Sequence, residues 1–415
     1  MVERSTPLPH ADAPAAGTPH RDSASSAMAS PGGGDQTAAQ QRSDTTAPDS
    51  SGDGGRVSGR PGGTQGRSQH GDRGNWTARR AYAAIDLGTN NCRLLIAKPA
   101  ADGFVVVDAF SRVVRLGEGL GQSGRLSDAA MDRAVAALSI CADKLRRRHV
   151  ALARSVATEA CRKASNGPAF IERVRRETGI VLDIISAEEE ARLAVLGCHI
   201  LLEPGDGPAL IFDIGGGSTE LVLVDSSGPV PDILDWLSVP WGVVTLTESE
   251  DFDPEDAAAR QTAYGRMRAR VMEGFADFAK RLPMLPDEDR RLLGTSGTVT
   301  TLASLHLDLP CYNRDAIDGL IVPSESMRAI STRLAGMSLN ERRHLPCIGK
   351  ERADLVVAGC AILESILDIW PAVRLGVADR GIREGILRAL MGRDAPGHVA
   401  APSQGAARSE GTGTS

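Results

Sequence analysis

Residues 86–97 read DLGTNNCRLLIA, and residues 213–224 read DIGGGSTELVLV. The two segments align without a gap, so that Asp86 matches Asp213. In each copy an apolar run leads into Asp-x-Gly, a turn of small polar residues follows, and a second apolar run resumes. Each copy is therefore typical of a β-hairpin, and the repeat predicts two similar α/β domains that face each other across a cleft.

The two turns have the composition of phosphate-binding loops. Backbone N–H groups in a turn of Gly, Asn, Ser and Thr can converge on an anion, because no large side chain blocks the approach. An aspartate at the end of the preceding strand can hold Mg²⁺, or another divalent cation, beside that anion. A single Asp-x-Gly hairpin is usually only a turn, but two matching copies favour a paired phosphate site. The predicted metal ligands are Asp86 and Asp213, and the predicted phosphate-binding residues of the turns are Gly88, Thr89, Asn90, Asn91, Gly215, Gly216, Gly217, Ser218 and Thr219.

The composition divides the chain into a central body and two tails. Residues 1–78 and 393–415 consist mainly of Gly, Pro, Ala, Ser, Thr and other polar residues. Such segments cannot bury enough apolar surface to offset about 1–2 kcal/mol of backbone ordering per residue, so we expect disordered tails. The body divides into domain I at 79–205, which holds the first turn, and domain II at 206–392, which holds the second.

Within the body, strand-like and helical spacings of apolar residues alternate, which is typical of a mixed α/β fold. Strands are expected at 82–85, 94–97, 104–110, 151–157, 180–185, 209–214, 220–224 and 373–378. Helices are expected at 131–145, 168–177, 187–202, 258–281, 298–306, 324–335, 351–369 and 382–391.

Composition and charge exclude several classes of protein. The chain has 24% charged residues and a net charge of −6, so it has no global field that would hold nucleic acid or an anionic membrane. No apolar stretch approaches the roughly 18–20 residues of a membrane span, and the polar N-terminus lacks the apolar core of a secretory signal. The seven cysteines are scattered without a CxxC pair. That distribution argues against a disulfide scaffold or a zinc site and favours the reducing cytoplasm.

Several segments of the body resemble the Ppx/GppA (exopolyphosphatase/guanosine pentaphosphate phosphatase) family, in the family's order. They are AIDLGTNNCRLLIA (84–97), VATEACRKASN (156–166), ISAEEEARL (185–193), IFDIGGGSTELV (211–222), LGTSGTVTTLA (293–303), ERADLVVAGCAIL (351–363) and GIREGIL (381–387). The resemblance implies two facing ribonuclease-H-like domains of the actin, sugar kinase and heat-shock ATPase superfamily, in the family's short two-domain form. It also implies Mg²⁺-dependent hydrolysis of a terminal phosphoanhydride in inorganic polyphosphate or in guanosine pentaphosphate (pppGpp), and hence a connection to the stringent response. The oligomeric state stays open, with a homodimer as one option.

Two acidic segments are candidates for the chemical step. Glu159 follows the strand expected at 151–157, and α/β proteins hold catalytic groups at the carboxyl ends of strands. The resemblance implies that Glu159 is the general base that activates water, and a solvated loop glutamate is the alternative. Glu188 matches the family's second acidic site residue, linked to metal or water, but acidic residues in a first helical turn also stabilise the helix dipole. Ser186 and Glu189 have the spacing of a capping box, so we expect a structural role for Glu189.

Cations and hydroxyl groups complete the candidate site. Arg93 directly follows the first turn, where a guanidinium group can bind a phosphate with two hydrogen bonds. The resemblance associates an arginine at this place with guanosine nucleotides, and an exposed strand arginine is the alternative. Ser296 and Gly297 open the helix expected at 298–306, where free N–H groups bind anions, although an ordinary helix cap has the same composition. Four further cations are candidates to line the path of a polyanion: Arg162, Lys163, Arg380 and Arg383.

Three other functions are compatible with parts of this pattern. A sugar kinase of the same superfamily needs an adenosine pocket and an acceptor-sugar site, for which the sequence has no convincing motif. A chaperone-type ATPase needs a peptide-binding domain after the nucleotide domain, for which no residues remain. A non-catalytic (p)ppGpp-binding regulator stays open, because binding requires the turns but not Glu159. We therefore predict an exopolyphosphatase first and a pppGpp 5′-phosphohydrolase second.

Overall fold

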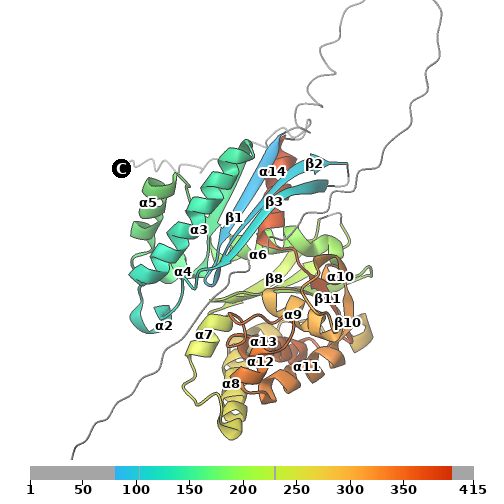
Figure 1. Cartoon of the computed structure of the whole chain (residues 1–415). Helices are drawn as coiled ribbons and strands as arrows, with labels where there is room; N and C mark the ends of the chain where they lie inside the picture. The colour runs from blue at the N-terminus through green and yellow to red at the C-terminus, as the bar shows by residue number, and fades with distance from the viewer. Residues whose placement is uncertain (1–79, 102, 229, 395–415) are drawn as a thin grey trace, which may run out of the picture. The chain divides into compact units, whose positions relative to one another are not determined.

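The computed structural model describes residues 80–101, 103–228 and 230–394 (Figure 1). The predicted disorder of the two tails falls on residues outside these ranges, with one exception. The last helix, α14 (Ile382–Asp394), continues through Arg393 and Asp394, which the composition places in the C-terminal tail. The described residues form two β-sheets with helices packed against them, which confirms the expected α/β fold.

The first sheet contains the hairpin of the first turn. Its strands are β1 (Ala81–Leu87), β2 (Asn91–Ala100), β3 (Gly103–Val113), β4 (Val150–Ala157) and β5 (Asp183–Ile184). Their order is β3-β2-β1-β4-β5. The first three strands form an antiparallel meander, and β4 runs parallel to β1. The first turn therefore lies at the carboxyl end of a central strand.

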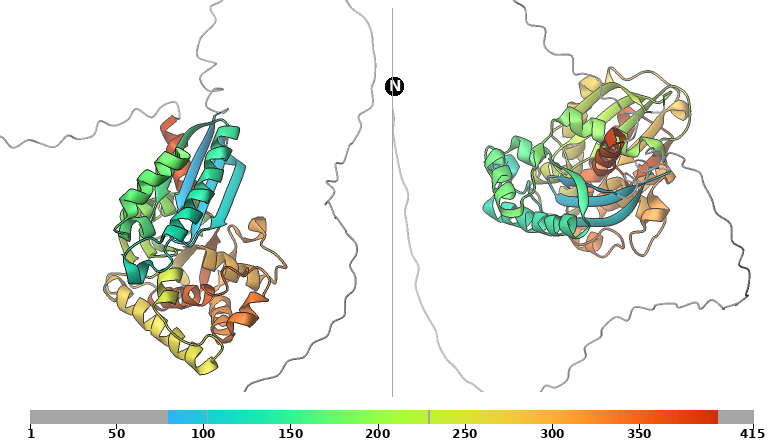
Figure 2. Two further views of the ribbon diagram at one scale, coloured as in Figure 1. Left: turned by 60° about the vertical axis from the view of Figure 1, so that its left-hand side comes forward. Right: turned by 90° about the horizontal axis from the view of Figure 1, so that it is seen from above.

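Helices cover both faces of this sheet, since successive residues of a strand point to opposite sides. Ile85 of β1 packs in the core formed with α3 (Asp128–Arg147) and α5 (Gly167–Thr178). Ala84, its neighbour, packs in the core formed with α6 (Ala187–Cys198) and α14. Figure 2 shows α3 and α5 on one side of the blue strands and the red helix α14 on the other. The short helices α2 (Leu120–Ser123) and α4 (Glu159–Lys163) lie in the connections.

The second sheet contains the hairpin of the second turn. Its strands are β6 (Pro208–Ile214), β7 (Thr219–Asp225), β8 (Asp232–Val239), β9 (Arg291–Thr295), β10 (Ile321–Pro323) and β11 (Arg374–Ala378). Their order is β10-β11-β9-β6-β7-β8, with β6, β9 and β11 parallel. The pairing of β6 with β7 repeats that of β1 with β2, as the internal repeat predicts, and β8 extends the second meander as β3 extends the first.

The helices of the second domain lie mainly on one face of this sheet. They are α7 (Val243–Glu248), α8 (Ala257–Ala279), α9 (Gly297–His306), α10 (Arg314–Ile317), α11 (Ser324–Gly336), α12 (Leu339–Arg343) and α13 (Val356–Ile369). The largest buried side chains of this core include Phe212, Phe275 and Trp370. The 3-10 helices are η1 (His199–Leu201) and η2 (Asp287–Asp289).

Helix α6 packs against both sheets. Leu193 and Ala194 belong to the core beneath the first sheet. Ala191 and Val195 of the same helix belong to a core with β6 and β7 of the second sheet. Because α6 is shared in this way, it holds the two domains together behind the two turns.

Helix α14 packs beside α6 at close range, as the right-hand view of Figure 2 shows in red. A Cβ on Gly197 of α6 would lie 1.9 Å from the carbonyl oxygen of Gly381, and a Cβ on Gly385 of α14 would lie 2.0 Å from that of Leu193. Glycine at both positions permits this approach. The helix consequently packs on the first sheet, although the sequence prediction counts it within the domain at 206–392.

Several element boundaries differ from those expected. Only Asp183 and Ile184 of the segment 180–185 pair as a strand, because Ile180 and Leu182 pack into the core with α3 and α5 instead. The helix expected from residue 351 begins at Val356. Strands β8 and β9 and helix α7 are absent from the sequence prediction, since each is short or only half-buried.

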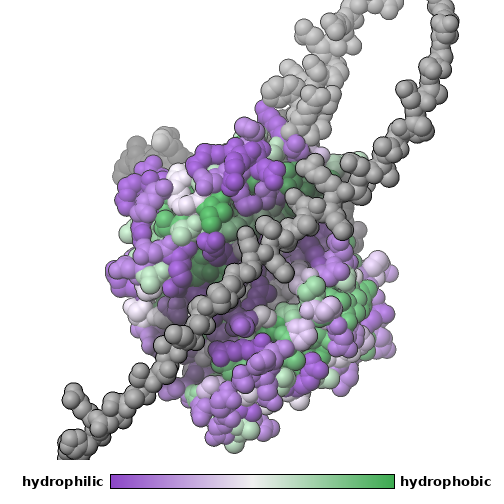
Figure 3. Space-filling model, in the orientation of Figure 1, coloured by the Kyte–Doolittle hydropathy of each residue, from purple (hydrophilic) through white to green (hydrophobic). Residues whose placement is uncertain are grey.

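The face of the molecule in Figure 3 is largely hydrophilic, with separate hydrophobic patches. Exposed large apolar residues such as Val105, Val181 and Met284 lie on different elements, in β3, before β5 and before η2. Within the described ranges, no helix has both the length and the apolar character that crossing a lipid bilayer requires.

Candidate active site

The two turns of the repeat line one cavity. The first turn joins β1 to β2, and the second joins β6 to β7. The cavity has a volume of about 120 Å³, which is the share of roughly four molecules in liquid water. Its lining from the two hairpins consists of Asp86, Gly88, Thr89, Asn90, Asn91, Arg93, Asp213, Ile214, Gly215, Gly216, Gly217 and Ser218. The repeat therefore faces itself across a single cavity.

The backbones of the two turns are closed in the same way. The N–H of Gly88 donates to the carbonyl oxygen of Asn91 over 2.9 Å, and the N–H of Gly215 donates to that of Ser218 over 2.9 Å. Helix α7 begins behind the second turn, where the N–H of Val243 donates to the carbonyl oxygen of Gly215 over 2.9 Å. These bonds fix the shape of the turns before any ligand arrives.

The second turn packs directly on the first turn and on Glu159. A Cβ on Gly217 would lie 2.6 Å from Thr89 Oγ1 and 2.9 Å from Glu159 Cγ, and a Cβ on Gly216 would lie 3.1 Å from the backbone nitrogen of Asn90. Both positions require glycine because the opposite wall of the cavity is so close. The contact places Glu159 of domain I against the second turn of domain II.

Four carboxylates lie in or near the cavity: Asp86, Asp213 and Glu190 line it, and the buried Glu220 lies opposite Asp213 on the neighbouring strand. Burial, with a further contribution from Glu190, raises the pKa of Asp213 to about 7, against the opposing charge of Arg93. Burial and the charge of Asp213 raise the pKa of Glu220 to about 7. Burial also raises the pKa of Asp86 and, together with the charge of Glu220, raises that of Glu190 well above its usual value. The raised pKa values mean that the charged forms of these carboxylates are disfavoured here, and a bound divalent cation would favour them.

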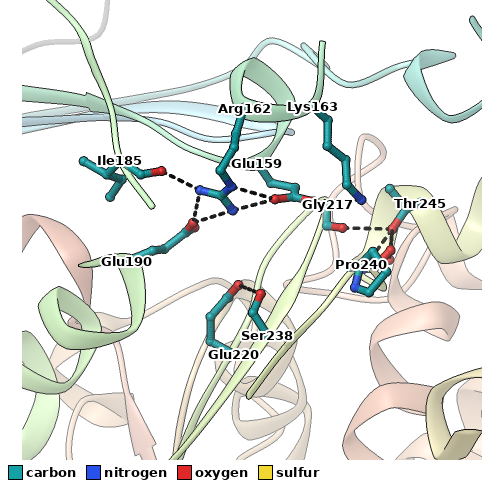
Figure 4. Close-up of polar contacts among 11 residues, drawn as sticks. Glu159, Arg162, Lys163, Ile185, Glu190, Gly217, Glu220, Ser238, Pro240 and Thr245 are labelled. Carbon is teal, nitrogen blue, oxygen red and sulfur yellow. Dashed lines mark hydrogen bonds and ion pairs between the residues drawn. The ribbon is translucent and has the colours of Figure 1, made fainter. Parts of the chain in front are cut away.

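Arg162 connects two of the acidic groups (Figure 4). Its guanidinium lies 2.5 Å from Glu159 Oε2 and 3.2 Å from Glu190 Oε2, and it donates to the carbonyl oxygen of Ile185 over 2.7 Å. Lys163 Nζ lies 2.8 Å from Glu159 Oε1. Each carboxylate oxygen of Glu159 thus has its own cation. Arg162 and Lys163, candidates for a polyanion path, are engaged with Glu159 instead.

The residues present fit a hydrated divalent cation. Asp86 and Asp213 line the cavity together with Glu190, but no group of three or more His, Cys, Asp or Glu side chains in the described part of the chain could enclose one ion. Proteins often bind Mg²⁺ through one or two carboxylates, with waters and substrate phosphates as the other ligands. The side-chain oxygens of Asn90 and Asn91 are buried without hydrogen-bond partners, so they are available to such waters or phosphates.

Most of the predicted phosphate-binding residues meet at the cavity, and Thr219 does not. Arg93, Ser296 and Gly297 all belong to its lining. Thr219 is completely buried, and its hydroxyl donates to the carbonyl oxygen of Trp241 over 2.7 Å. The Thr219 side chain therefore supports the strand after the turn and does not face a ligand.

Helix α6 contributes Glu190 to the cavity, and the predicted Glu188 is not part of its lining. Glu188 is exposed, whereas Glu190 is only 7% exposed. Glu190 lies one helical turn before the buried Leu193, so the 3.6-residue period of the core face could have identified it. Only half of the capping box expected for Glu189 forms: its N–H donates to Ser186 Oγ over 3.1 Å, and its side chain lies 2.6 Å from Arg154.

Sequence reasoning also missed part of the wall from domain II. Thr298 and Thr301 of α9 line the cavity, and so do Arg352, Leu355 and Val356 at the start of α13. Thr158, which precedes α4, Val243, which begins α7, and Ile382, which begins α14, also line the cavity. Arg352 lies in a segment that was expected to be regular helix, so no local signal separates it from an ordinary surface arginine.

A larger cavity, which we call the basic chamber, adjoins the first one. Its volume is about 900 Å³. The two cavities share Asp86, Asn91, Arg93, Asp213, Ser296, Gly297, Thr301, Arg352 and Ile382. The cationic residues of the chamber are Arg93, Arg112, Arg314, Lys350, Arg352, Arg380 and Arg383. Of the cations predicted for a polyanion path, Arg380 and Arg383 are therefore in place.

Only some of these cations are paired. Arg314 lies 3.2 Å from Asp379, and Arg380 lies 2.6 Å from Asp318. Burial and the positive charge of Arg93 lower the pKa of Arg352. The chamber cations without an ion-pair partner among the described residues are Arg93, Arg112, Lys350 and Arg352. Unpaired positive charge in a cavity attracts anions. Here the unpaired cations extend from the cavity of the two turns into the adjoining basic chamber.

Comparison with known proteins gives the chain a family. Residues 95–394 match the model of the Ppx/GppA phosphatase family. Exopolyphosphatase 2 of Mycobacterium tuberculosis is 31% identical over 324 residues, which cover 75% of this chain and 98% of that protein. The guanosine-5'-triphosphate,3'-diphosphate pyrophosphatase of Aeromonas hydrophila is 29% identical over 313 residues, which cover 75% of this chain and 60% of that protein.

Solved structures agree with this result. The crystal structure of the Aquifex aeolicus Ppx/GppA family member has a TM-score of 0.63 and 28% identity, covering 76% of this chain and 99% of that chain. That of an exopolyphosphatase from Cytophaga hutchinsonii has a TM-score of 0.67 and 25% identity, covering 75% of this chain and 98% of that chain. These matches confirm the predicted family and fold. The chain therefore belongs to the Ppx/GppA phosphatase family of hydrolases.

Proposed function

We propose that the protein is an exopolyphosphatase, which releases orthophosphate from the end of inorganic polyphosphate. It is an enzyme of phosphoanhydride hydrolysis, and the names of its relatives supply two substrates, polyphosphate and a guanosine polyphosphate. The observation that carries the choice is the basic chamber. It adjoins the phosphate cavity and holds four cations without a carboxylate partner among the described residues, of which Arg112 and Lys350 lie outside the phosphate cavity. A polyphosphate chain bears charge on every phosphate, so it can use cations that lie beyond the first cavity.

The residues of the first cavity divide the chemical work. The turn amides and Ser218 hold the terminal phosphates. Asp86 and Asp213 would hold the divalent cation, with Glu190 in the place that the sequence assigned to Glu188. Bound Mg²⁺ supplies Lewis-acid neutralisation of charge on the phosphate oxygens.

Glu159 serves the attacking water. It orients the water and accepts its proton while the water oxygen bonds to the terminal phosphorus and the bond from that phosphorus to the bridging oxygen breaks. Arg162 and Lys163, at 2.5 and 2.8 Å from the two carboxylate oxygens, hold this side chain in one orientation. The bridging oxygen leaves with the shortened chain, and chamber cations stabilise its charge.

A second candidate function is the hydrolysis of pppGpp to ppGpp. Tyr312 is the aromatic residue among the described lining of the chamber, and it is 47% exposed. An exposed ring offers a nucleobase a stacking surface. Arg93 lines both the chamber and the first cavity, so it can contact the phosphates of a nucleotide whose base lies in the chamber. A non-catalytic regulator would use the same contacts but would not need Glu159.

Orthophosphate release from polyphosphate and from pppGpp by the purified full-length protein tests these alternatives. We expect a higher kcat/KM for polyphosphate, and loss of release when the divalent cation is chelated. A double change of Arg112 and Lys350 to Gln should lower kcat/KM for polyphosphate more than for pppGpp. The matched control is Arg333→Gln, an exposed arginine of α11 outside the chamber. Preference for pppGpp would favour the second candidate, and binding without phosphate release would favour the regulator.

A further inference from the structure

Domain II contains another cavity, which we call the α12 cavity. Its volume is about 220 Å³, the share of roughly seven molecules in liquid water. Within the described part of the chain, it has no lining residue in common with the first cavity or the basic chamber. Its apolar lining consists of Phe252, Pro254, Met267, Ala335, Leu339 and Val357. A small molecule with an apolar body would fit these walls.

Two buried arginines meet at the α12 cavity. Arg342 is 4% exposed and Arg260 is 9% exposed. Arg260 donates to the carbonyl oxygens of Pro254 and Gly336 over 2.9 Å each, and its Nε is buried without a partner. Arg342 Nε donates to the carbonyl oxygen of Ser338 over 3.3 Å, but its two terminal nitrogens make no hydrogen bond among the described residues. Burial lowers the pKa of Arg342, and the charge of Arg260 lowers it too.

The carboxylates of the α12 cavity are engaged with other cations. Glu250 lies 2.7 Å from Arg266 and 3.1 Å from Arg270. Asp354 Oδ2 lies 3.1 Å from Arg115, and Asp354 Oδ1 is buried without a partner. Both carboxylates thus form ion pairs with other arginines, and neither forms an ion pair with Arg342, although the charge of Asp354 is close enough to raise the pKa of Arg342. An isolated buried cation is costly unless an anion accompanies it.

We propose that the α12 cavity is a second binding site, and that its ligand is a small organic anion. The anionic head accepts hydrogen bonds from the terminal nitrogens of Arg342, and a short apolar body packs against Phe252 and Met267. A carboxylate of six carbons has eight non-hydrogen atoms and matches the volume of the cavity. The site is distinct from the phosphate cavity in both place and chemistry.

The α12 cavity and the first cavity share a wall, which gives this ligand a route to the active site. At the start of α13, Arg352 and Leu355 line the first cavity, whereas Asp354 and Val357 line the α12 cavity. In α7, Val243 lines the first cavity and Thr247 lines the α12 cavity. A ligand that shifts either element on one side must shift it on the other.

The same wall carries contacts between the two domains. Asp354 pairs with Arg115 of the first domain. Glu248, which follows Thr247, accepts a hydrogen bond from the N–H of Gly119 over 3.0 Å. The wall between the two cavities therefore includes two contacts that join the domains.

Calorimetry and thermal unfolding of the full-length protein with hexanoate test the site, and hexan-1-ol is the matched neutral probe. Hexanoate should bind and raise the unfolding midpoint, and hexan-1-ol should bind much more weakly. Arg342→Gln should weaken hexanoate binding by about 10–100-fold, the loss expected for one charged hydrogen bond. Arg343→Gln, the exposed neighbour on α12, should bind as wild type does.

A second variant keeps the test independent of the arginine. Leu339→Phe narrows the cavity without changing its charge, so it should also weaken hexanoate binding. Equal binding of the acid and the alcohol, binding by Arg342→Gln and Leu339→Phe that equals that of wild type, or no binding of hexanoate at all would overturn the proposal. These measurements contain no phosphate substrate, so their outcome does not depend on whether the protein hydrolyses polyphosphate.

Discussion

Gly217 of the second turn lies against Glu159 of α4, so closely that a Cβ on Gly217 would come within 2.9 Å of Glu159 Cγ. The contact joins the phosphate-type turn of domain II to the candidate base of domain I. It explains why the second turn has glycine at position 217. Any side chain here would separate the base from the phosphate that it serves.

Gly217→Ala should lower kcat for phosphate release by about tenfold or more, since overpacking of a tight site typically costs about 1–3 kcal/mol and 1.36 kcal/mol is a factor of ten in rate. Gly121→Ala is the matched control, because a Cβ on Gly121 would meet no atom within 4 Å. Steady-state kinetics on the two variants check this. A Gly217→Ala enzyme as fast as the control would show that the cleft tolerates the added methyl group.

Glu159→Gln should lower kcat by about 10²–10⁴-fold, the usual value of general-base assistance. The change keeps the size of the side chain and removes its basic carboxylate. Affinity for polyphosphate should change little, because the turns and the chamber bind it. Phosphate release and equilibrium binding, measured on the same preparation, separate the two effects.

The matched control for this variant is Glu188→Gln on the exposed side of α6. It should leave kcat within a factor of about two, since a surface substitution away from the site changes little. Loss of activity in Glu188→Gln together with normal activity in Glu159→Gln would show that Glu188, and not Glu159, is the general base.

The pKa of Asp213 predicts a pH dependence of stability. Burial raises this pKa from 3.8 to about 7, so between these values the folded protein holds a proton that the unfolded chain has lost. The free energy of unfolding therefore falls as the pH rises through this range. Asp213→Asn removes this decrease in the free energy of unfolding, because asparagine does not titrate. Without metal, the variant should therefore unfold at a higher temperature than wild type at pH 8, and the difference in unfolding temperature should be smaller at pH 5.

Mg²⁺ provides the complementary measurement. At pH 8 it should raise the unfolding midpoint of wild type, because it binds the folded carboxylates, and raise that of Asp213→Asn less. A variant that is less stable than wild type at pH 8, or that gains as much from Mg²⁺, would count against Asp213 as a buried metal ligand.

Arg93→Ala should weaken pppGpp binding by about 1–3 kcal/mol, the range for a charged hydrogen bond. The affinity for polyphosphate should fall less, because polyphosphate also contacts the other unpaired cations of the chamber. Arg333→Ala on the exposed side of α11 is the control. Binding constants for both ligands at one ionic strength check the difference, and equal weakening would exclude a nucleotide-specific role for Arg93.

The hairpins of the repeat could be predicted from sequence because their information is local. An apolar run, Asp-x-Gly and a second apolar run specify a strand, a turn and a strand that follow one another directly in the sequence, at 82–97 and again at 209–224. The pairing of the two hairpins across one cavity followed from their similarity. By contrast, the choice between Glu188 and Glu190 depends on which face of α6 is buried, and adjacent glutamates look alike in a sequence.

Other features depend on contacts between distant segments. Helix α14 packs on the first sheet because Gly197 and Gly385 let its backbone approach α6. No local sequence pattern predicts that α14 packs beside α6. Arg352 reaches the cavity because the helix expected there begins only at Val356. The approach of Gly217 to Glu159 is a contact between domains, so composition and spacing could not reveal it.

Hydrolysis of polyphosphate in water enriched in ¹⁸O, under single-turnover conditions, tests the central claim most directly. If Glu159 directs water to the terminal phosphorus, the label appears in the released orthophosphate and the shortened chain stays unlabelled. Glu159→Gln should form the same labelled product about 10²–10⁴-fold more slowly. Label in the shortened chain, or no release of orthophosphate by the wild-type protein, would contradict terminal hydrolysis at this site.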